Sequence, residues 1–239
     1  MCGRYSFTTP PEAMRRVFDI KGLLPNLAAR YNIAPTQDAP VVRQTKEGEG
    51  RELAMLRWGL VPSWSQGPDS GYSMINARAE TVATKPAFRS AFRLRRCLVP
   101  ADGFYEWRKL AGRKQPYRIT LKDDAPFAFA GLWEHWRGPD CYVIQSFTIV
   151  VTEANELLRP IHDRMPVILD PADYALWLGE KAESSKGVGA LLRPFPADAM
   201  VAYPVSKRVS NPRNDDPQCV EPLQAPDGQP LRHIRDGPA

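Results

Sequence analysis

Proline is the residue that most limits what this 239-residue chain can fold into, because 24 prolines are spread along its length. That is about twice the ordinary share of about 5%. Proline breaks helix interiors and interrupts central strands, so this spacing argues against an architecture of long helices. Between the prolines lie short runs rich in β-branched and aromatic residues, which are typical of strands. We expect strands at Leu53–Trp58, Cys97–Val99, Phe104–Trp107, Tyr117–Leu121, Phe127–Ala130, Tyr142–Val151 and Pro166–Leu169.

Helical signals are fewer and shorter. We expect helices after Pro10-Pro11, within Thr81–Phe92, from Thr152 to Leu158, and at Gly187–Leu192. A further helix should start at Asp170-Pro171, an N-cap residue followed by proline at the first helical position, and run to Leu178. Together these elements predict an α+β fold, in a single β-rich domain over residues 1–210. Residues 211–239, rich in Pro, Asp and Gly, read as a loosely ordered tail.

Composition excludes several classes of protein. The chain is 43% hydrophobic, which supports a core, yet no apolar run approaches the ~18–20 residues of a membrane span. Arg4, Glu12 and the following arginines interrupt any N-terminal signal sequence. The four cysteines form no CxxC pair and only three histidines are present, so we expect no metal, cofactor or disulfide framework. We expect a monomeric, cytoplasmic protein, nucleoid-associated in a bacterium and nuclear in a eukaryote.

The chain begins Met1-Cys2-Gly3-Arg4, and a small residue at position 2 permits removal of the initiator methionine. Cys2 would then carry a free α-amine and a thiol two carbons apart, the spacing that captures an aldehyde and closes a five-membered thiazolidine. An α-amine has a pKa near ~7.7–8.0, so a useful fraction is unprotonated at pH 7, unlike a lysine near ~10.4. From its position alone, Cys2 could equally be an ordinary residue at a frayed terminus.

Five further segments are too unusual in composition to be explained by packing. They are Tyr31–Gln37, Trp58–Trp64, Asn76–Thr81, Arg95–Trp107 and Ile161–Pro166. With Cys2-Gly3-Arg4, and in this order, they resemble the SRAP family (SOS response-associated peptidase), over Cys2 to about Pro204. The resemblance implies a curved, partly barrel-like antiparallel sheet core flanked by short helices. It also implies a DNA-damage function, in which Cys2 captures the aldehyde of an abasic site in single-stranded DNA by lyase-type chemistry and stays attached.

The resemblance also assigns roles beside Cys2. Glu106 matches the catalytic glutamate of the family, and its apolar run Phe104–Trp107 predicts a raised pKa suited to proton transfer. His162 matches the active-site histidine and would move protons at the sugar O4′ or the imine. Asn76, whose amide both donates and accepts, would lie beside the cysteine and orient its amine. Without the resemblance, each could be a structural residue.

Single-stranded DNA binds to basic grooves and stacks on exposed aromatic rings. The predicted DNA contacts are Arg4, Asn32, Trp64, Arg78 and Arg164. The resemblance implies single-stranded DNA with abasic sites as the partner, and we also expect DNA at replication forks. Trp58, by contrast, is expected in the core. The net charge of +5 only mildly favours a polyanion. A weaker basic cluster, which a solvated face would also explain, is formed by Arg89, Arg93, Arg95 and Arg96.

Three alternatives remain open from the sequence. A glutamine amidotransferase of the N-terminal nucleophile type also starts Met-Cys-Gly, but its downstream motifs are missing here. A peptidase could use Cys2, His162 and Glu106 as a thiol triad. A non-catalytic reader of damaged DNA would bind without forming an adduct through Cys2.

Overall fold

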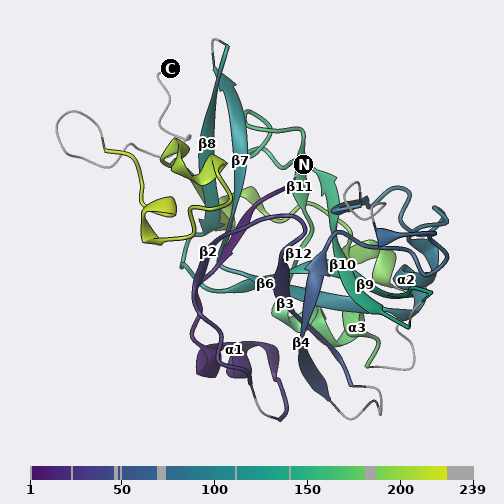
Figure 1. Ribbon diagram of the computed structural model, residues 1–239. Coiled ribbons are helices and arrows are strands. Elements are labelled where there is room, and N and C mark those ends of the chain that lie inside the picture. The colour runs from purple at the N-terminus through teal and green to yellow at the C-terminus, as the bar shows by residue number, and fades with distance from the viewer. Residues whose placement is uncertain are drawn as a thin grey trace.

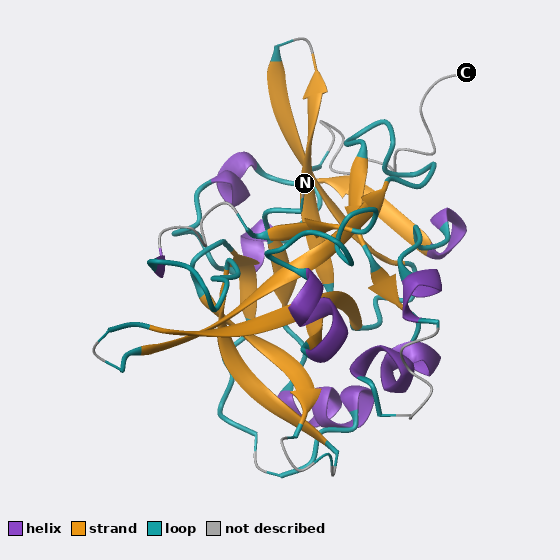
Figure 2. Ribbon diagram, turned by 90° about the vertical axis from the view of Figure 1, so that its right-hand side faces the viewer, coloured by secondary structure: helices purple, strands orange, loops and turns teal. Residues whose placement is uncertain are grey.

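The computed structural model describes residues 2–22, 24–45, 48, 50–68, 74–110, 112–139, 141–180 and 187–224, which form two sheets with short helices around them (Figure 1). The first sheet is antiparallel throughout. Its β7–β8 hairpin projects beyond the body of the molecule (Figure 2). In order across this sheet, its strands are β13 (Met200–Pro204), β8 (Arg113–Leu121), β7 (Gly103–Leu110), β1 (Tyr5–Phe7) and β2 (Arg30–Ile33).

The second sheet closes on itself, because β9 pairs with both β6 and β10. Strands β10, β4, β3, β6 and β9 therefore form a small barrel of five strands, which is mixed because β4 runs parallel to β10. The short strand β5 (Asn76–Arg78) also pairs with β10 in parallel. In order, the sheet contains β11 (Arg164–Pro166), β10 (Val143–Glu153), β4 (Arg51–Trp58), β3 (Asp38–Gln44), β6 (Arg96–Ala101), β9 (Phe127–Arg137) and β12 (Ile168–Leu169).

The helices are short and lie around the two sheets (Figure 1). They are α1 (Pro11–Phe18), α2 (Arg89–Leu94) and α3 (Tyr174–Leu178). The described residues also include five short 3₁₀ helices: η2 (Pro171–Asp173), η3 (Val188–Leu191), η4 (Ala197–Ala199), η5 (Lys207–Ser210) and η6 (Pro217–Cys219). None of the helices in this part of the chain is long and apolar enough to cross a membrane.

A buried aromatic cluster joins the two sheets. Tyr5 of β1 meets Trp58 of β4 at a ring separation of 5.2 Å and Phe129 of β9 at 5.8 Å, both edge to face. Such edge-to-face pairs add stability beyond the area they bury. The Trp58 indole also donates to the Ile75 carbonyl at 2.9 Å. The core thereby fixes the start of β1 relative to β5, and these two segments carry Cys2 and Asn76.

The prediction of a single β-rich domain with a partly barrel-like core is confirmed. Every predicted strand overlaps an observed one, and Asp170 caps the 3₁₀ turn before α3, accepting from the Ala172 amide at 2.9 Å. The expected helix from Thr152 is wrong, because Thr152 pairs with Met165 in the ladder between β10 and β11. The expected helix within Thr81–Phe92 begins only at Arg89, after Pro86.

Residues 207–223 pack back against the first sheet. Asp215 accepts from the Tyr31 and Asn32 amides at 2.5 and 2.9 Å and pairs with Arg30. Cys219 is fully buried, and the Leu223 amide donates to the Pro204 carbonyl at 2.9 Å. These contacts lie beyond residue 210, and the division between a domain of residues 1–210 and a tail of residues 211–239 stays a prediction.

Candidate active site and DNA-binding surface

Cys2 and Glu106 lie on neighbouring segments of the first sheet. Tyr5 pairs with Phe104, and the Tyr105 amide donates to the Arg4 carbonyl at 3.0 Å. In an antiparallel pair, each step back along one strand lies opposite a step forward along the other. The segment before Arg4 therefore runs alongside Glu106, which follows Tyr105. Cys2 is fully buried and Glu106 is only 3% exposed. A thiol and a carboxyl group, 104 positions apart in sequence, are thus held together away from solvent.

Burial sets the protonation of both groups. Desolvation raises the pKa of Glu106 above its ordinary value of 4.5, and His162, when it carries a proton, opposes that rise. Desolvation, together with the negative charge of Glu106, raises the pKa of the Cys2 thiol far above its ordinary value of 9.0. The thiol is therefore neutral at physiological pH. The Glu106 carboxyl group holds its proton at higher pH than a solvated glutamate and can act as an acid.

Asn76 approaches Cys2 from the second sheet. Its Nδ2 donates to the Cys2 carbonyl at 2.8 Å. The position of Asn76 is fixed by the parallel pairing of β5 with β10, where Asn76 lies opposite Ile149. This hydrogen bond places Asn76 beside Cys2 and holds the Cys2 carbonyl, and a role in orienting the Cys2 amine stays a prediction.

His162 reaches the same region because it lies two residues before the start of β11. Strand β10 separates β5 from β11, with Val151 paired to both Arg78 and Pro166. The Arg164 amide donates to His162 Nδ1 at 3.0 Å, so a neutral imidazole carries its proton on Nε2. Asp163 Oδ1 lies 2.9 Å from the same Nδ1 and can accept a hydrogen bond from it only after the ring is protonated. The ring can therefore both give and take a proton.

Three of the predicted DNA contacts lie at or near the surface. The Trp64 side chain is 65% exposed, in the loop after β4. Arg78 ends β5 and is also exposed. Arg164 is half-buried and pairs with Glu80. Although partial burial acts in the opposite direction, hydrogen bonds from its own backbone and from Arg164 lower the pKa of Glu80.

The other two predicted DNA contacts, Arg4 and Asn32, are committed within the protein. Arg4 donates to Asn32 Oδ1 at 2.9 Å and to the Val209 carbonyl at 2.7 Å. Asn32 is fully buried, and its Nδ2 donates to the carbonyls of Val209, Asn211 and Asn214 at 2.7–3.1 Å. A side chain without exposed surface touches no DNA in this conformation. The geometry therefore gives Asn32 the role of fastening residues 209–214 against β2 and Arg4.

Asp102, which is buried, and Asp215, which is half-buried, are polar residues that sequence reasoning did not single out. Asp102 holds β1 against β7 and β8, since it accepts from the Ser6 hydroxyl at 2.6 Å and pairs with Arg118 at 3.1 Å. Gly103 is required beside it, because a Cβ there would lie 2.8 Å from the Arg118 guanidinium. Asp102 and Gly103 lie inside the segment Arg95–Trp107, whose unusual composition was the available signal. No equivalent signal marked Asp215.

No group of three or more metal-ligating side chains occurs among the residues that the structure describes. The grouping of thiol, carboxyl, imidazole and amide fits covalent and proton-transfer chemistry.

Comparison with known proteins gives a consistent picture. The family model described as SOS response associated peptidase (SRAP) matches residues 1–212. "Abasic site processing protein YoqW" from Bacillus subtilis is 42% identical over 224 residues, which cover 92% of this chain and 99% of that protein. "Abasic site processing protein HMCES" from Xenopus tropicalis is 31% identical over 263 residues, covering 92% and 78%. A crystal structure of a protein from Bacteroides thetaiotaomicron superposes with a TM-score of 0.80 at 27% identity, covering 92% and 99%.

Proposed function

The chain belongs to the SRAP family, whose model matches residues 1–212, and from that premise we propose that it processes abasic sites, as its relatives' names state of them. In this proposal Met1 is removed, since only then is the Cys2 nitrogen an amine. The amine and thiol then capture the ring-opened sugar aldehyde of an abasic site in single-stranded DNA. The thiazolidine product shields the strand from breakage.

One observation carries the proposal most strongly: Asn76 donates to the Cys2 carbonyl at 2.8 Å, beside the buried Glu106. Groups from both sheets thus converge on the second residue of the chain. An incidental cysteine at a frayed terminus would need no such arrangement. The arrangement supports a role for the terminal residue itself, including its nitrogen.

The protonation states favour an order of events. The neutral thiol is a poor first nucleophile, so the amine attacks the C1′ aldehyde and forms a carbinolamine. Glu106 gives its proton to the carbinolamine hydroxyl, which leaves as water, and an iminium remains. The thiol sulfur then bonds to the iminium carbon while its proton passes to the Glu106 carboxylate. One water is released overall, and Glu106 ends in the state in which it began.

His162 is assigned to the sugar. Opening the deoxyribose ring requires a proton at O4′ as the C1′–O4′ bond breaks and removal of the proton on the C1′ hydroxyl. The protonated ring, whose Nδ1–H has a partner in Asp163 Oδ1 at 2.9 Å, can supply the first from Nε2 and is left neutral. In the reverse direction the neutral ring takes the same proton back.

The same pKa directions argue against the peptidase reading of the site. Nucleophilic cysteines in peptidases act as thiolates, which need a lowered pKa. Burial and Glu106 move the pKa of the Cys2 thiol the opposite way. The amine-first mechanism uses a neutral thiol and is therefore the better match to this environment.

DNA binding is assigned to the exposed side of the site. Arg78 and Arg164 would bind phosphates next to the lesion, and Trp64 would stack on an adjacent base. Arg4 and Asn32 are placed outside this set, because their polar groups hold the chain near Cys2. Action as a monomer at replication forks remains a prediction.

The test is adduct formation with a single-stranded oligonucleotide carrying one abasic site. Wild-type protein should give a species that survives denaturation in SDS, and Cys2→Ala should give none. Cys97→Ala is the matched control, since Cys97 is equally buried but lies in β6, in the barrel, and it should crosslink as wild type does. Crosslinking by Cys2→Ala at the wild-type rate would refute the proposal.

A further inference from the structure

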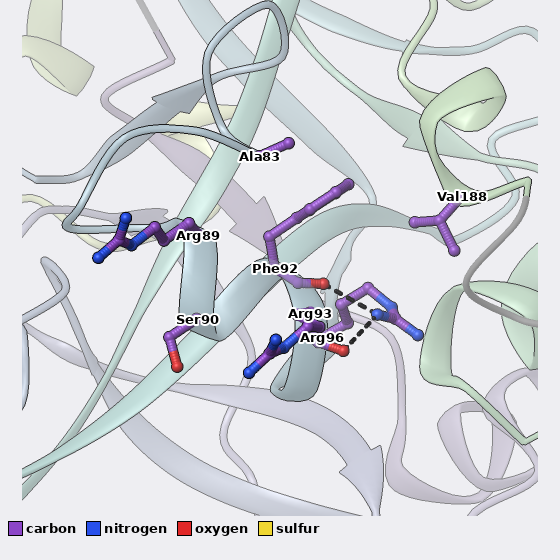
Figure 3. Close-up of a pocket in the computed structure, with 7 residues that line it drawn as sticks. All are labelled: Ala83, Arg89, Ser90, Phe92, Arg93, Arg96 and Val188. Carbon is purple, nitrogen blue, oxygen red and sulfur yellow. Dashed lines mark hydrogen bonds between the residues drawn. The ribbon is translucent and has the colours of Figure 1, made fainter.

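Helix α2 carries two arginines that have no role in the site described above. Arg89 and Arg93 are four residues apart, and Figure 3 shows them on the same helix. Like charges at this spacing destabilise a helix, and α2 has no acidic residue in its first turn. Among the described residues, neither guanidinium makes an ion pair, whereas the neighbouring Arg95 pairs with Glu134 at 2.5 Å.

Arg96 has a different, structural task. Its guanidinium donates to the carbonyls of Phe92 and Arg93 at 2.8 and 3.0 Å and to the carbonyl of Trp177. It therefore ties the last turn of α2 to α3. Of the basic cluster noted in the sequence, only Arg89 and Arg93 offer their charge to solvent.

These two arginines line a hollow of about 750 Å³ between α2 and η3 (Figure 3). Its other lining side chains include the Ser90 hydroxyl, the half-buried Phe92 ring and Arg96, and none of the lining residues is acidic. Two free guanidinium groups, a hydroxyl donor and an aromatic ring are the combination with which proteins hold a nucleic-acid strand. The lining includes neither Cys2 nor Glu106.

The hollow continues toward the active site. It shares Ala83 and Phe92 with a second hollow of about 420 Å³, whose lining begins at Ala79 and Glu80, directly after Arg78. Two acidic residues line this second hollow. Glu80 pairs with Arg164, and Glu153 lies opposite Arg164 in the pairing of β10 with β11. Arg164 thus offsets the negative charge of Glu80 and Glu153 along the path between Arg78 and the pair Arg89 and Arg93.

We propose that the two hollows form one groove, which carries the single strand away from the abasic site on one of its two sides. Arg89 and Arg93 bind phosphates in this flanking strand, and Phe92 contacts a base. The inference rests on the proposed function, because it extends the path of the same DNA strand. It predicts a contact that depends on strand length and polarity, which phosphate contacts beside the lesion would not show.

The test compares three single strands: a trinucleotide with a central abasic site, and two strands of about 15 nucleotides, near the upper site size of a single-strand binding fold, with the lesion close to either the 5′ or the 3′ end. Affinity is measured by fluorescence anisotropy at several salt concentrations, with a tetrahydrofuran analogue that lacks the aldehyde. The variant is Arg89→Gln/Arg93→Gln. The matched control, Arg15→Gln/Arg16→Gln, removes the same charge from α1, which lies away from α2 (Figure 1).

Arg89→Gln/Arg93→Gln should weaken binding of one long strand and leave the other long strand and the trinucleotide as in wild type. For that strand, the slope of log affinity against log salt should fall by about 0.7 for each arginine that contacts a phosphate. Arg78→Gln, at the lesion, should weaken all three probes. Equal losses on both long strands, a loss on the trinucleotide, or no loss beyond the α1 control would overturn the groove.

Two different measurements distinguish a failure of the proposed function from a failure of the groove. Capture of the aldehyde-bearing trinucleotide by wild-type protein tests that function alone. The anisotropy series uses an analogue that cannot be captured, so it measures the affinity of the groove for the flanking strand independently of covalent capture.

Discussion

The two sheets contribute opposite kinds of groups to the candidate site. The first sheet supplies Cys2 and Glu106, which are 0% and 3% exposed. The second sheet and its loops supply exposed groups, Arg78 on β5 and Trp64 after β4. Desolvation shifts the pKa values on the first side, while charges on the second side stay solvated and free to meet phosphate. The comparison indicates that the buried groups around Cys2 and the exposed groups proposed to meet DNA can be altered separately, although the second sheet also supplies Asn76 to the buried side.

The largest expected effect is on the buried side. Glu106→Gln keeps the size of the side chain and removes the proton that the proposed mechanism transfers. Capture of an abasic site should slow by about 10²-fold or more, the usual contribution of general acid–base catalysis. The affinity for an uncapturable abasic analogue should be unchanged. A parallel loss of affinity and rate would show that the two sides are not separable.

Asn32→Ala tests whether a predicted DNA contact is a structural residue instead. It leaves the carbonyls of Val209, Asn211 and Asn214 without their common donor and should lower the free energy of unfolding by about 3 kcal/mol, measured by urea denaturation. Asn211→Ala, at an exposed position in the same segment, is the control and should cost less than about 0.5 kcal/mol. Unchanged stability with weakened DNA binding would return Asn32 to the DNA surface.

Trp64→Ala probes the exposed side. Loss of one stacking platform should weaken single-strand binding by about 1–3 kcal/mol, without a change in the free energy of unfolding. Tyr142→Ala removes an equally exposed aromatic ring, 66% exposed and directly before β10, and should leave the affinity as in wild type. If both variants weaken binding alike, the effect is not specific to the site.

The smallest effect is a pH dependence of stability. The pKa of Glu106 is raised in the folded protein, so above its ordinary value of 4.5 the folded state holds a proton that the unfolded state has lost. The free energy of unfolding should therefore fall as the pH rises from 4.5 through the folded pKa of Glu106. Glu106→Gln should remove this part of the decline, measured by denaturant titration at each pH. The pKa values of Asp19 and Glu80 are lowered in the folded protein, so titration of these two carboxyl groups changes the free energy of unfolding at or below their ordinary pKa values of 3.8 and 4.5. Identical slopes in wild type and variant would mean that Glu106 is not desolvated.

Strands with long apolar runs could be predicted because their residue types and spacing are local properties. The short strands β1 and β5 could not, since each contains only three residues and is held by its neighbours. The end of β10 was assigned to a helix because its strand conformation also depends on a neighbour. Thr152 pairs with Met165 of β11, and this pairing is not visible in the residues around Thr152.

The candidate site shows the same limit. Cys2, Glu106, Asn76 and His162 could be named from their segments, and Glu106 could be expected in an apolar setting. The burial of Asn32 could not be foreseen, because its partners are carbonyls of Val209, Asn211 and Asn214. Backbone carbonyls carry no sequence signal. The sequence reading placed Arg4 at the DNA because Arg4 lies within a few residues of Cys2, and that argument could not reveal its internal hydrogen bonds.

The most direct test of the amine-first mechanism is intact mass spectrometry after incubation with an abasic single strand. Wild-type protein should lack Met1 and should give, without reductant, one adduct with the summed mass of protein and DNA less one water. Cys2→Ser keeps the amine but lacks the thiol, so it should give a lasting adduct only when borohydride reduces the imine. An equally stable Cys2→Ser adduct without reductant, or a wild-type adduct that still carries Met1, would contradict the account.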